Sequence, residues 1–237
     1  DFGVIFHSLV KDWKDLIKFF YQENAANTYQ PSNYLPDDST FLVVFYRPLI
    51  FVFYYIQSLF WGTNPYGYFL VSIFFHALNA VLFFNISLFF VSYIWAFLGA
   101  MFFSFHSSLG AWIGWVSAQQ YNFELFFLFL LFIFFRWYLS SNKIHYYLLA
   151  CGCFLLCLFT RESAIFLPLF IFVGVYLFEG SGSLKSSFYY SVGFIFVSSF
   201  YLLVRFLLFP FSVARGIDNP VLFIKKILHG IFYSAYI

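Results

Sequence analysis

The residues in this sequence that could do chemistry are a few polar and charged side chains that interrupt long apolar stretches. An ionisable group at membrane depth is costly to bury, so each one requires a functional or a structural reason. An arginine can bind a phosphate through two parallel hydrogen bonds, and a carboxylate can take a proton from a hydroxyl group. The set comprises Arg47, His76, Asn79, His106, Gln119, Gln120, Asn122, Glu124, Arg161 and Glu162.

Several members of this set are spaced so that their side chains share a helix face. His76 and Asn79 lie three residues apart, and Gln120 and Glu124 lie four apart, so each pair lies on one side of a helix. The first pair fits either a polar cavity or an interhelical hydrogen bond. The second pair belongs to a set that fits the lining of a polar cavity at the end of a span, namely His106, Gln119, Gln120, Asn122 and Glu124.

The two arginines and His106 stand at the ends of apolar runs, where a side chain can reach the membrane surface. Arg47 precedes Pro48, which suits the first turn of a helix. Its guanidinium is therefore placed either to bind a phosphate or to reach lipid headgroups. Arg161 and Glu162 are adjacent between two runs, where they either partly neutralise each other or mark a boundary.

No pattern in the sequence specifies a metal or a nucleotide. Histidines, cysteines and carboxylates do not form a cluster with zinc spacing, and no glycine-rich phosphate loop follows a strand. Cys151, Cys153 and Cys157 fall in one apolar run, which predicts small packed side chains and not disulfides or metal ligands. The sequence therefore implies no certain cofactor, and a requirement for a divalent metal stays open.

The composition determines the class of protein. Hydrophobic residues make up 63% and aromatic residues 28% of the 237 residues, whereas charged residues make up 9%. Soluble domains carry about 25% charged residues, and so few polar side chains cannot cover a surface that faces water. With a net charge of only +2, the chain is not a nucleic-acid binder. Its solvent must be the lipid bilayer.

Charge divides the chain into a polar beginning and an apolar remainder. Residues 1–40 hold nine of the 22 charged side chains (12 basic plus 10 acidic). Within them, Leu9, Trp13, Leu16, Ile17 and Phe20 form one helical face, which predicts an amphipathic helix lying in the membrane interface. We expect a loop with this helix at 1–40, a multi-span membrane domain at 41–209, and the start of a further loop or further spans at 210–237.

Apolar runs separated by short breaks predict an all-α integral membrane protein, a polytopic bundle of about seven spans. A span requires about 20 apolar residues. Seven complete crossings would put Arg47 and Arg161 on opposite sides of the membrane, and the basic residues would divide almost evenly between the sides, so charge does not set the orientation. The runs are 48–61, 66–86, 90–105, 118–137, 144–160, 163–178 and 188–209.

Short motifs in a fixed order along residues 46–205 resemble a known family. The first are Tyr46-Arg47-Pro48-Leu49, Gly62-Thr63-Asn64-Pro65-Tyr66-Gly67-Tyr68 and His76-Ala77-Leu78-Asn79. The later ones are Phe105-His106, Trp115-Val116-Ser117, Thr160-Arg161-Glu162, Leu167-Pro168-Leu169 and Tyr201-Leu202-Leu203-Val204-Arg205. Together they resemble the polyprenyl-phosphate-sugar-dependent glycosyltransferases of the GT-C superfamily, in the protein O-mannosyltransferase-like branch that includes the tetratricopeptide-repeat O-mannosyltransferases.

The resemblance implies a hexosyltransferase, with mannose among the candidate sugars. It would move the sugar from a polyprenyl-phosphate donor to a hydroxyl of a protein, lipid or glycan, with inversion at the anomeric carbon. The active face would be non-cytoplasmic, in a bacterial inner membrane or the endoplasmic reticulum. The loop at 1–40 would lie on that face, and the sequence would lack the family's first span.

The resemblance also implies roles for individual residues. Asp1-Phe2-Gly3 is similar to the second member of the family's acidic pair, which makes Asp1 the carboxylate that takes the acceptor proton. Arg47, Arg161 and His106 would stabilise the leaving phosphate. The remaining polar residues would line the cavity, and they are His76, Asn79, Gln120, Asn122, Glu124 and Glu162.

The sequence departs from the family pattern at three places. Ser107 stands where the family has proline, and Arg161 where it has lysine. The region in which the branch often has arginine and aspartate holds Gln119, Gln120 and Asn122 instead. The loss of a carboxylate there implies either an altered donor choice or a site that binds without turnover.

Two other interpretations of the sequence remain open. A transporter or flippase-like bundle for lipid-linked sugars also needs polar groups inside the membrane, and an inverted repeat would favour it. A structural membrane subunit would use His76, Asn79 and Glu124 as hydrogen-bonding contacts between helices. An acidic pair at the membrane surface distinguishes the transferase from both.

Overall fold

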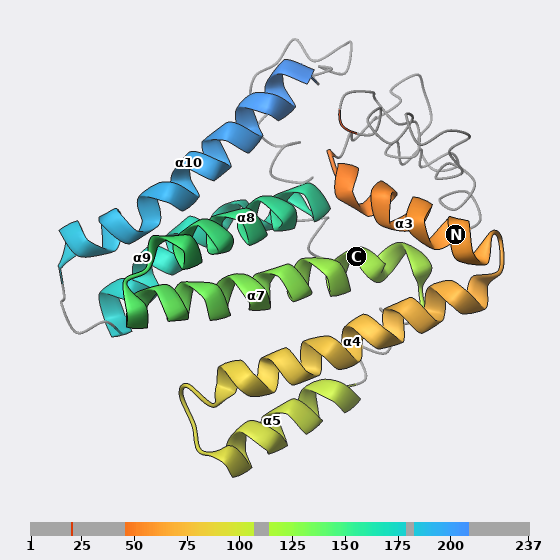
Figure 1. Cartoon of the computed structure of the whole chain (residues 1–237), viewed down its shortest axis with the longest axis horizontal. Helices are drawn as coiled ribbons and strands as arrows, with labels where there is room; N and C mark the ends of the chain where they lie inside the picture. Colours follow the sequence, from red (N-terminus) through yellow and green to blue (C-terminus); the bar gives the residue numbers. More distant parts are fainter. Residues whose placement is uncertain (1–19, 21–45, 107–113, 179–182, 209–237) are drawn as a thin grey trace, which may run out of the picture.

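The computed structural model describes residues 20, 46–106, 114–178 and 183–208, and all regular structure in these ranges is helical. Two short 3₁₀ segments, η2 (Val116–Ala118) and η3 (Glu162–Phe166), precede longer helices (Figure 1). The longer helices are α3 (Pro48–Trp61), α4 (Pro65–Ser87), α5 (Tyr93–Phe105), α7 (Gln119–Ser141), α8 (Ile144–Thr160), α9 (Leu167–Phe178) and α10 (Leu184–Leu208).

Each of the seven apolar runs forms a helix, so the expected all-α bundle is confirmed for the described residues. The runs 48–61 and 144–160 coincide with α3 and α8. The run 163–178 is different, because its first residues belong to η3 and the α-helix begins only at Leu167. An apolar run shows where a helix can form but does not distinguish a 3₁₀ turn from an α-helical one.

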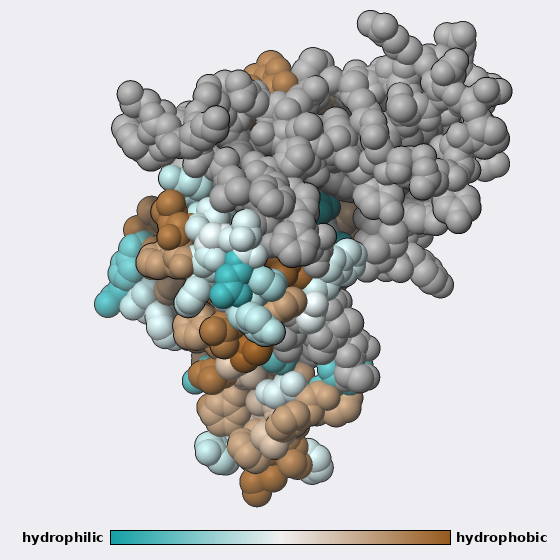
Figure 2. Space-filling view, turned by 90° about the vertical axis from the view of Figure 1, so that its right-hand side faces the viewer, coloured by the Kyte–Doolittle hydropathy of each residue, from teal (hydrophilic) through white to brown (hydrophobic). Residues whose placement is uncertain are grey.

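Three helical segments are long and apolar enough to cross a membrane, namely Pro65–Ser87, Val116–Ser141 and Leu184–Leu208. Large apolar side chains are exposed along the helices, among them Phe60, Phe196 and Leu207, each more than 70% exposed. Figure 2 shows hydrophobic residues over most of the lower part of one face. Such a surface suits lipid and not water, so this is a membrane protein by helix length and surface composition.

Helices that are adjacent in the sequence pack against each other, and so do helices that are farther apart in the sequence. The most extensive contact joins α7 to α8, followed by α9 with α10 and by α4 with both α7 and α5. The ring pairs Phe75–Phe123, Phe83–Phe129 and Phe90–Phe132 follow one another in order, so α4 and α7 run parallel along this contact. A large core cluster joins α7, α8, α9 and α10, and a smaller one joins α3 to α4 and the start of α7.

The turn between α3 and α4 explains one of the sequence motifs by local geometry. Gly62 has a φ of 55°, in the left-handed region that favours glycine. Asn64 caps α4 through a 3.1 Å bond from the backbone N–H of Tyr66, and Pro65 takes the first helical position. Gly67 lies against the ring of Trp61, where a Cβ atom would clash. The motif is therefore a compact helix–turn–helix connection.

The position of α3 does not fit seven complete crossings. The ring of Phe53 contacts both Phe75 in α4 and Phe123 near the start of α7, so α3 lies along the first half of α4. If all five helices between residues 47 and 162 crossed the membrane, Arg47 and Glu162 would lie on opposite sides of it. In the structure the two side chains form an ion pair. At about 1.5 Å per residue, the 14 residues of α3 span only about 21 Å, less than a hydrocarbon core of about 30 Å. α5 is shorter still, with 13 residues, so α3 and α5 are both candidates for a helix that does not cross.

Candidate anion-binding site at one end of the bundle

The first part of the site is built around the guanidinium of Arg47, immediately before α3. Its Nε donates to Oε2 of Glu162 at 2.8 Å, and its Nη1 donates to Oε1 of Gln120 at 2.9 Å. The second carboxylate oxygen of Glu162 accepts the backbone N–H of Tyr46 at 3.0 Å. The side chains of Arg47 and Glu162 are only 13% and 16% exposed. A shielded, hydrogen-bonded pair of this kind fixes both groups far better than a surface ion pair does.

The second part of the site is built around Glu124 in the second turn of α7. One carboxylate oxygen accepts the hydroxyl of Ser163 at 2.6 Å, and the other lies 3.6 Å from Nη1 of Arg161. The guanidinium of Arg161 also lies over the ring of Tyr121, 4.2 Å from its centroid, in a cation–π contact. Arg161 is thus held between a carboxylate and an aromatic face.

Arg161 and Glu162 are sequence neighbours, and each forms an ion pair with a residue of another element. They were expected to neutralise each other. In the structure Glu162 pairs with Arg47, and Arg161 pairs with Glu124. We call Arg47, Gln120, Glu124, Arg161 and Glu162 the ion-pair network. Its geometry could not be read from the sequence, because residues 47 and 162 meet only once α3, α7 and α8 are packed.

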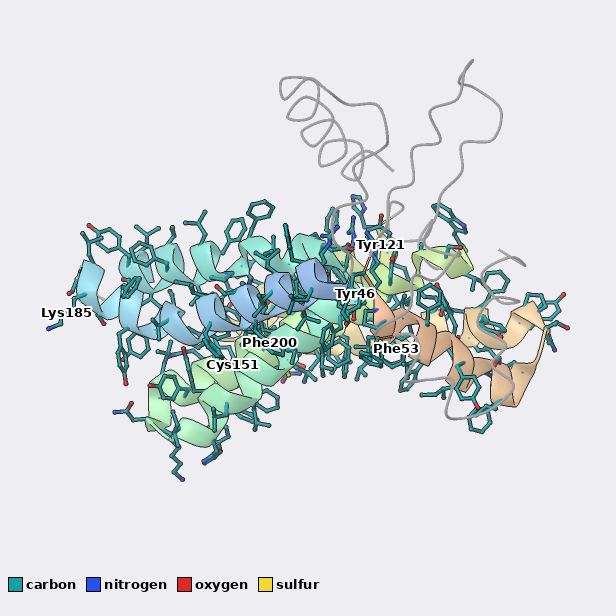
Figure 3. All side chains as sticks on the ribbon, turned by 90° about the horizontal axis from the view of Figure 1, so that it is seen from above. Tyr46, Phe53, Tyr121, Cys151, Lys185 and Phe200 are labelled. Atoms are coloured by element: carbon teal, nitrogen blue, oxygen red, sulfur yellow. The ribbon has the colours of Figure 1, made fainter. Side chains whose placement is uncertain are left out.

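The network lies where several helices begin. The first residues of α3 and α7 and the η3 segment before α9 all contribute to it. These helix starts carry a partial positive charge that favours an anion, and the end of α8 contributes the opposite charge because its last residue, Thr160, directly precedes Arg161. In Figure 3, Tyr46 and Tyr121 lie midway along the molecule, which is one end of the part formed by α7, α8, α9 and α10, and Lys185 marks the opposite end of that part.

Tyr46 anchors the network to the helices behind it. Its backbone carbonyl accepts the hydroxyl of Tyr201 in α10 at 3.0 Å, and its own hydroxyl donates to the carbonyl of Phe20 at 3.0 Å. Burial raises the pKa of the Tyr46 hydroxyl, so this group remains a donor at neutral pH. The ring of Phe20 packs on Phe159. The remainder of the amphipathic helix expected at 9–21 lies outside the described residues.

Two of the residues expected in the cavity, His76 and Asn79, form side-chain bonds to neighbouring helices. Nε2 of His76 lies 3.2 Å from the carbonyl of Ser104 in α5, and Nδ2 of Asn79 donates to the carbonyl of Asn122 in α7 at 2.9 Å. Asn79 and Asn122 are fully or almost fully buried. These contacts match the interhelical alternative for His76 and Asn79.

A buried amide pair lies in the same region, and the sequence singled out only one of its members, Gln119. Gln57 of α3 donates to Oε1 of Gln119 at 3.0 Å, and Gln119 donates to the carbonyl of Tyr68 at 2.6 Å. A lone glutamine inside the apolar run 48–61 was the signal that could have revealed it. Ser163 and Tyr121 were missed as well, although both flank residues that had been chosen.

The other expected site residues are His106, at the end of α5, and Asp1. His106 follows the last residue of α5 and its ring contacts Phe102. Asp1 and Ser107 lie outside the described residues. All three cysteines lie on α8 as free thiols, and Cys153 and Cys157 are buried. Within the described ranges, histidines, cysteines and carboxylates form no group that could hold a metal ion.

Comparison of the chain with protein-family models, with curated proteins and with solved structures finds no match.

Proposed function

We propose that this chain is part of a membrane glycosyltransferase of the GT-C type, which transfers a sugar from a polyprenyl-phosphate donor to a hydroxyl acceptor. The observation that carries the proposal is the ion-pair network. It joins Arg47 of the Tyr-Arg-Pro-Leu motif to Arg161 and Glu162 of the Thr-Arg-Glu motif, which are far apart in the chain. Two motifs that resemble one family thus contribute to a single polar site.

The position of the network suits a lipid phosphate. A polyprenyl phosphate has one charged end and one long apolar tail, so its binding site needs cations next to a surface that accepts hydrocarbon. Arg47 and Arg161 supply the cations, and exposed apolar side chains such as Phe166 and Leu169 of η3 and α9 follow Arg161 in the chain. This arrangement allows the phosphate to stay at the polar end while the tail remains in lipid.

The proposed reaction is an inverting group transfer. The acceptor hydroxyl attacks the anomeric carbon, the bond from that carbon to the phosphate oxygen breaks, and the electron pair leaves with the polyprenyl phosphate. Asp1 takes the proton of the hydroxyl, and Arg47, Arg161 and His106 stabilise the negative charge that develops on the phosphate. The acceptor class includes proteins, lipids and glycans.

The proposed placement is multi-pass with α3 excluded from the crossings. The end of the bundle that holds the ion-pair network then faces the non-cytoplasmic side, in a bacterial inner membrane or the endoplasmic reticulum. The loop at 1–40 joins α3 at this end, which brings Asp1 to the same side of the membrane as the arginines.

The proposal is tested by a transfer assay in membranes that contain the protein. The assay measures how much labelled sugar leaves polyprenyl-phosphate donors for an acceptor. We expect transfer by the wild type and at least a hundredfold loss in Arg161→Gln, because one transition-state donor of this kind supplies about 10²–10³ in rate. Arg136→Gln is the matched control, since Arg136 is exposed on α7 and lies over the ring of Phe89. Equal transfer in both variants, or none in the wild type with any donor, contradicts the proposal.

A structural membrane subunit is the second candidate, and one observation favours it. His76 and Asn79 bond to neighbouring helices, as a structural role in helix packing requires. On this interpretation the ion-pair network also serves packing, and Arg161→Gln lowers the stability of the protein without affecting any sugar transfer.

A further inference from the structure

We propose that Glu162 occupies the phosphate site of Arg47 while no donor is bound, and that the lipid phosphate replaces it. This inference rests on the proposed function, because it assigns an occupant to an arginine that the donor is proposed to use. The exchange makes Glu162 a competitor of the substrate and the η3 segment a part that moves on binding.

The contacts of Glu162 are those of a bound anion. One oxygen accepts the backbone N–H of Tyr46 and the other accepts Nε of Arg47, at 3.0 Å and 2.8 Å. Backbone N–H groups beside a helix start, combined with an arginine, also hold phosphate oxygens in proteins. Because carboxylate and phosphate use the same donors in the same geometry, Glu162 fills positions that a phosphate would need.

The net charge of the network also indicates that a carboxylate must move before a phosphate binds. Its two arginines are each paired with a glutamate, at 2.8 Å and 3.6 Å, so its four charged side chains sum to zero. A phosphate that entered without displacing a carboxylate would lie beside two negative groups in a poorly solvated place, where repulsion is strong. Binding therefore requires that one carboxylate leave its arginine.

The local structure identifies Glu162 as the group that leaves. It is the first residue of η3, and none of the five residues of that 3₁₀ segment is buried. Short 3₁₀ segments have poorer hydrogen bonds than α-helices and often mark hinges. Glu124, in contrast, lies inside α7, and its backbone carbonyl also accepts the thiol of Cys157. Glu162 can leave by a shift of the short η3 segment, whose Ser163 bonds to Glu124 and whose Ala164 and Ile165 pack against the core, whereas Glu124 is held on a long packed helix.

Binding of a long-chain polyprenyl monophosphate to the purified protein in detergent micelles tests the exchange. We expect Glu162→Gln to bind this lipid at least tenfold more tightly than the wild type, because an amide competes for Arg47 without a charge. Glu179→Gln makes the same change in charge after the end of α9 and should leave the affinity as it is. An affinity that is unchanged or weaker in Glu162→Gln overturns the proposal.

Phosphatidic acid, a phosphomonoester on a different lipid, separates this inference from the proposed function. Tighter binding of the polyprenyl lipid alone supports both. Tighter binding of both lipids to an equal extent supports the exchange and contradicts a site selective for polyprenyl donors. If the wild type and the variant bind neither lipid, both the exchange and the proposed function are wrong.

Hydrogen exchange in the wild type gives a second measurement that needs no variant. Saturation with the polyprenyl monophosphate should speed amide exchange in residues 162–166, because η3 loses the contact that holds its first residue. Exchange in the middle of α7 should not change. Slower or unaltered exchange in residues 162–166 at saturation would show that Glu162 keeps its place, and the inference would fail.

Discussion

Arg47 shows how much of a residue's role depends on partners far from it in the sequence. Residue type and position beside Pro48 indicated a cation at the start of a helix, and this is confirmed. Its partners Glu162 and Gln120 come from segments more than seventy residues away. Residue type and local spacing therefore identified most of the polar set, but the pairing between its members required the packed helices.

The value of the Arg47–Glu162 pair can be measured by a double-mutant cycle. Arg47→Met should lower the free energy of unfolding by about 2 kcal/mol, because it leaves a shielded carboxylate without its cation. Glu162→Met should cost a similar amount. The double variant should recover much of this loss, since replacing both partners of a buried pair with apolar side chains is often nearly neutral.

Unfolding in detergent, followed by tryptophan fluorescence, measures these differences. The cycle gives the coupling between the two side chains directly, and we expect at least 1 kcal/mol. If the double variant loses as much free energy of unfolding as the two single variants together, the two side chains are not coupled, and the prediction is wrong.

At the scale of the elements, apolar runs predicted where helices form but not how each is used. Seven runs gave seven helices, because a chain surrounded by lipid must satisfy its backbone hydrogen bonds internally. The 3₁₀ start at Glu162–Phe166 escaped prediction, since its residues are as compatible with an α-helix as with a tighter turn. The contact between α8 and α10 also depends on a detail invisible in hydropathy, the absence of a side chain at Gly193.

Gly193→Ala tests this helix contact. A Cβ atom at Gly193 would lie 2.5 Å from the Tyr147 hydroxyl, which donates to the carbonyl of Tyr190 at 3.0 Å. The Tyr147 ring packs against Phe194 and cannot move aside easily. We expect a loss of about 1–3 kcal/mol, as in other overpacked interiors.

Gly152→Ala is the matched control for this substitution. Gly152 lies in α8, and no atom lies within 4 Å of a Cβ atom built there. Alanine is the better helix former by about 1 kcal/mol, so this variant should be as stable as the wild type or more so. Thermal unfolding midpoints of the two variants in the same detergent measure the contrast. Equal midpoints would refute the close α8–α10 contact.

For the whole molecule, composition alone established a membrane protein, but it could not determine the path through the membrane. The count of about seven crossings treated every apolar run alike. The Arg47–Glu162 pair joins the start of α3 to the segment that follows α8, and we propose that α3 is the helix that does not cross. A chain of short helices can therefore satisfy the hydropathy pattern while one of them returns to the side on which it began.

Cysteine labelling with a membrane-impermeant reagent tests the placement of α3. In a chain without its native cysteines, Thr40→Cys and Thr63→Cys, which precede and follow α3, should react from the same side of the membrane. Lys143→Cys, exposed at the turn between α7 and α8, should react from the opposite side. Labelling of Thr40→Cys and Thr63→Cys from opposite sides would establish a complete crossing by α3.

The claim that the ion-pair network receives a lipid phosphate is tested most directly by photo-crosslinking. The probe is a polyprenyl phosphate with a diazirine in the first isoprene unit, added to membranes that contain the wild-type protein. We predict labelled peptides that cover residues 46–50 or 160–166, and loss of this label in Arg47→Gln but not in Arg136→Gln. Label concentrated near residues 141–149, at the other end of α7 and α8, or spread evenly along the lipid-facing helices, would contradict the account.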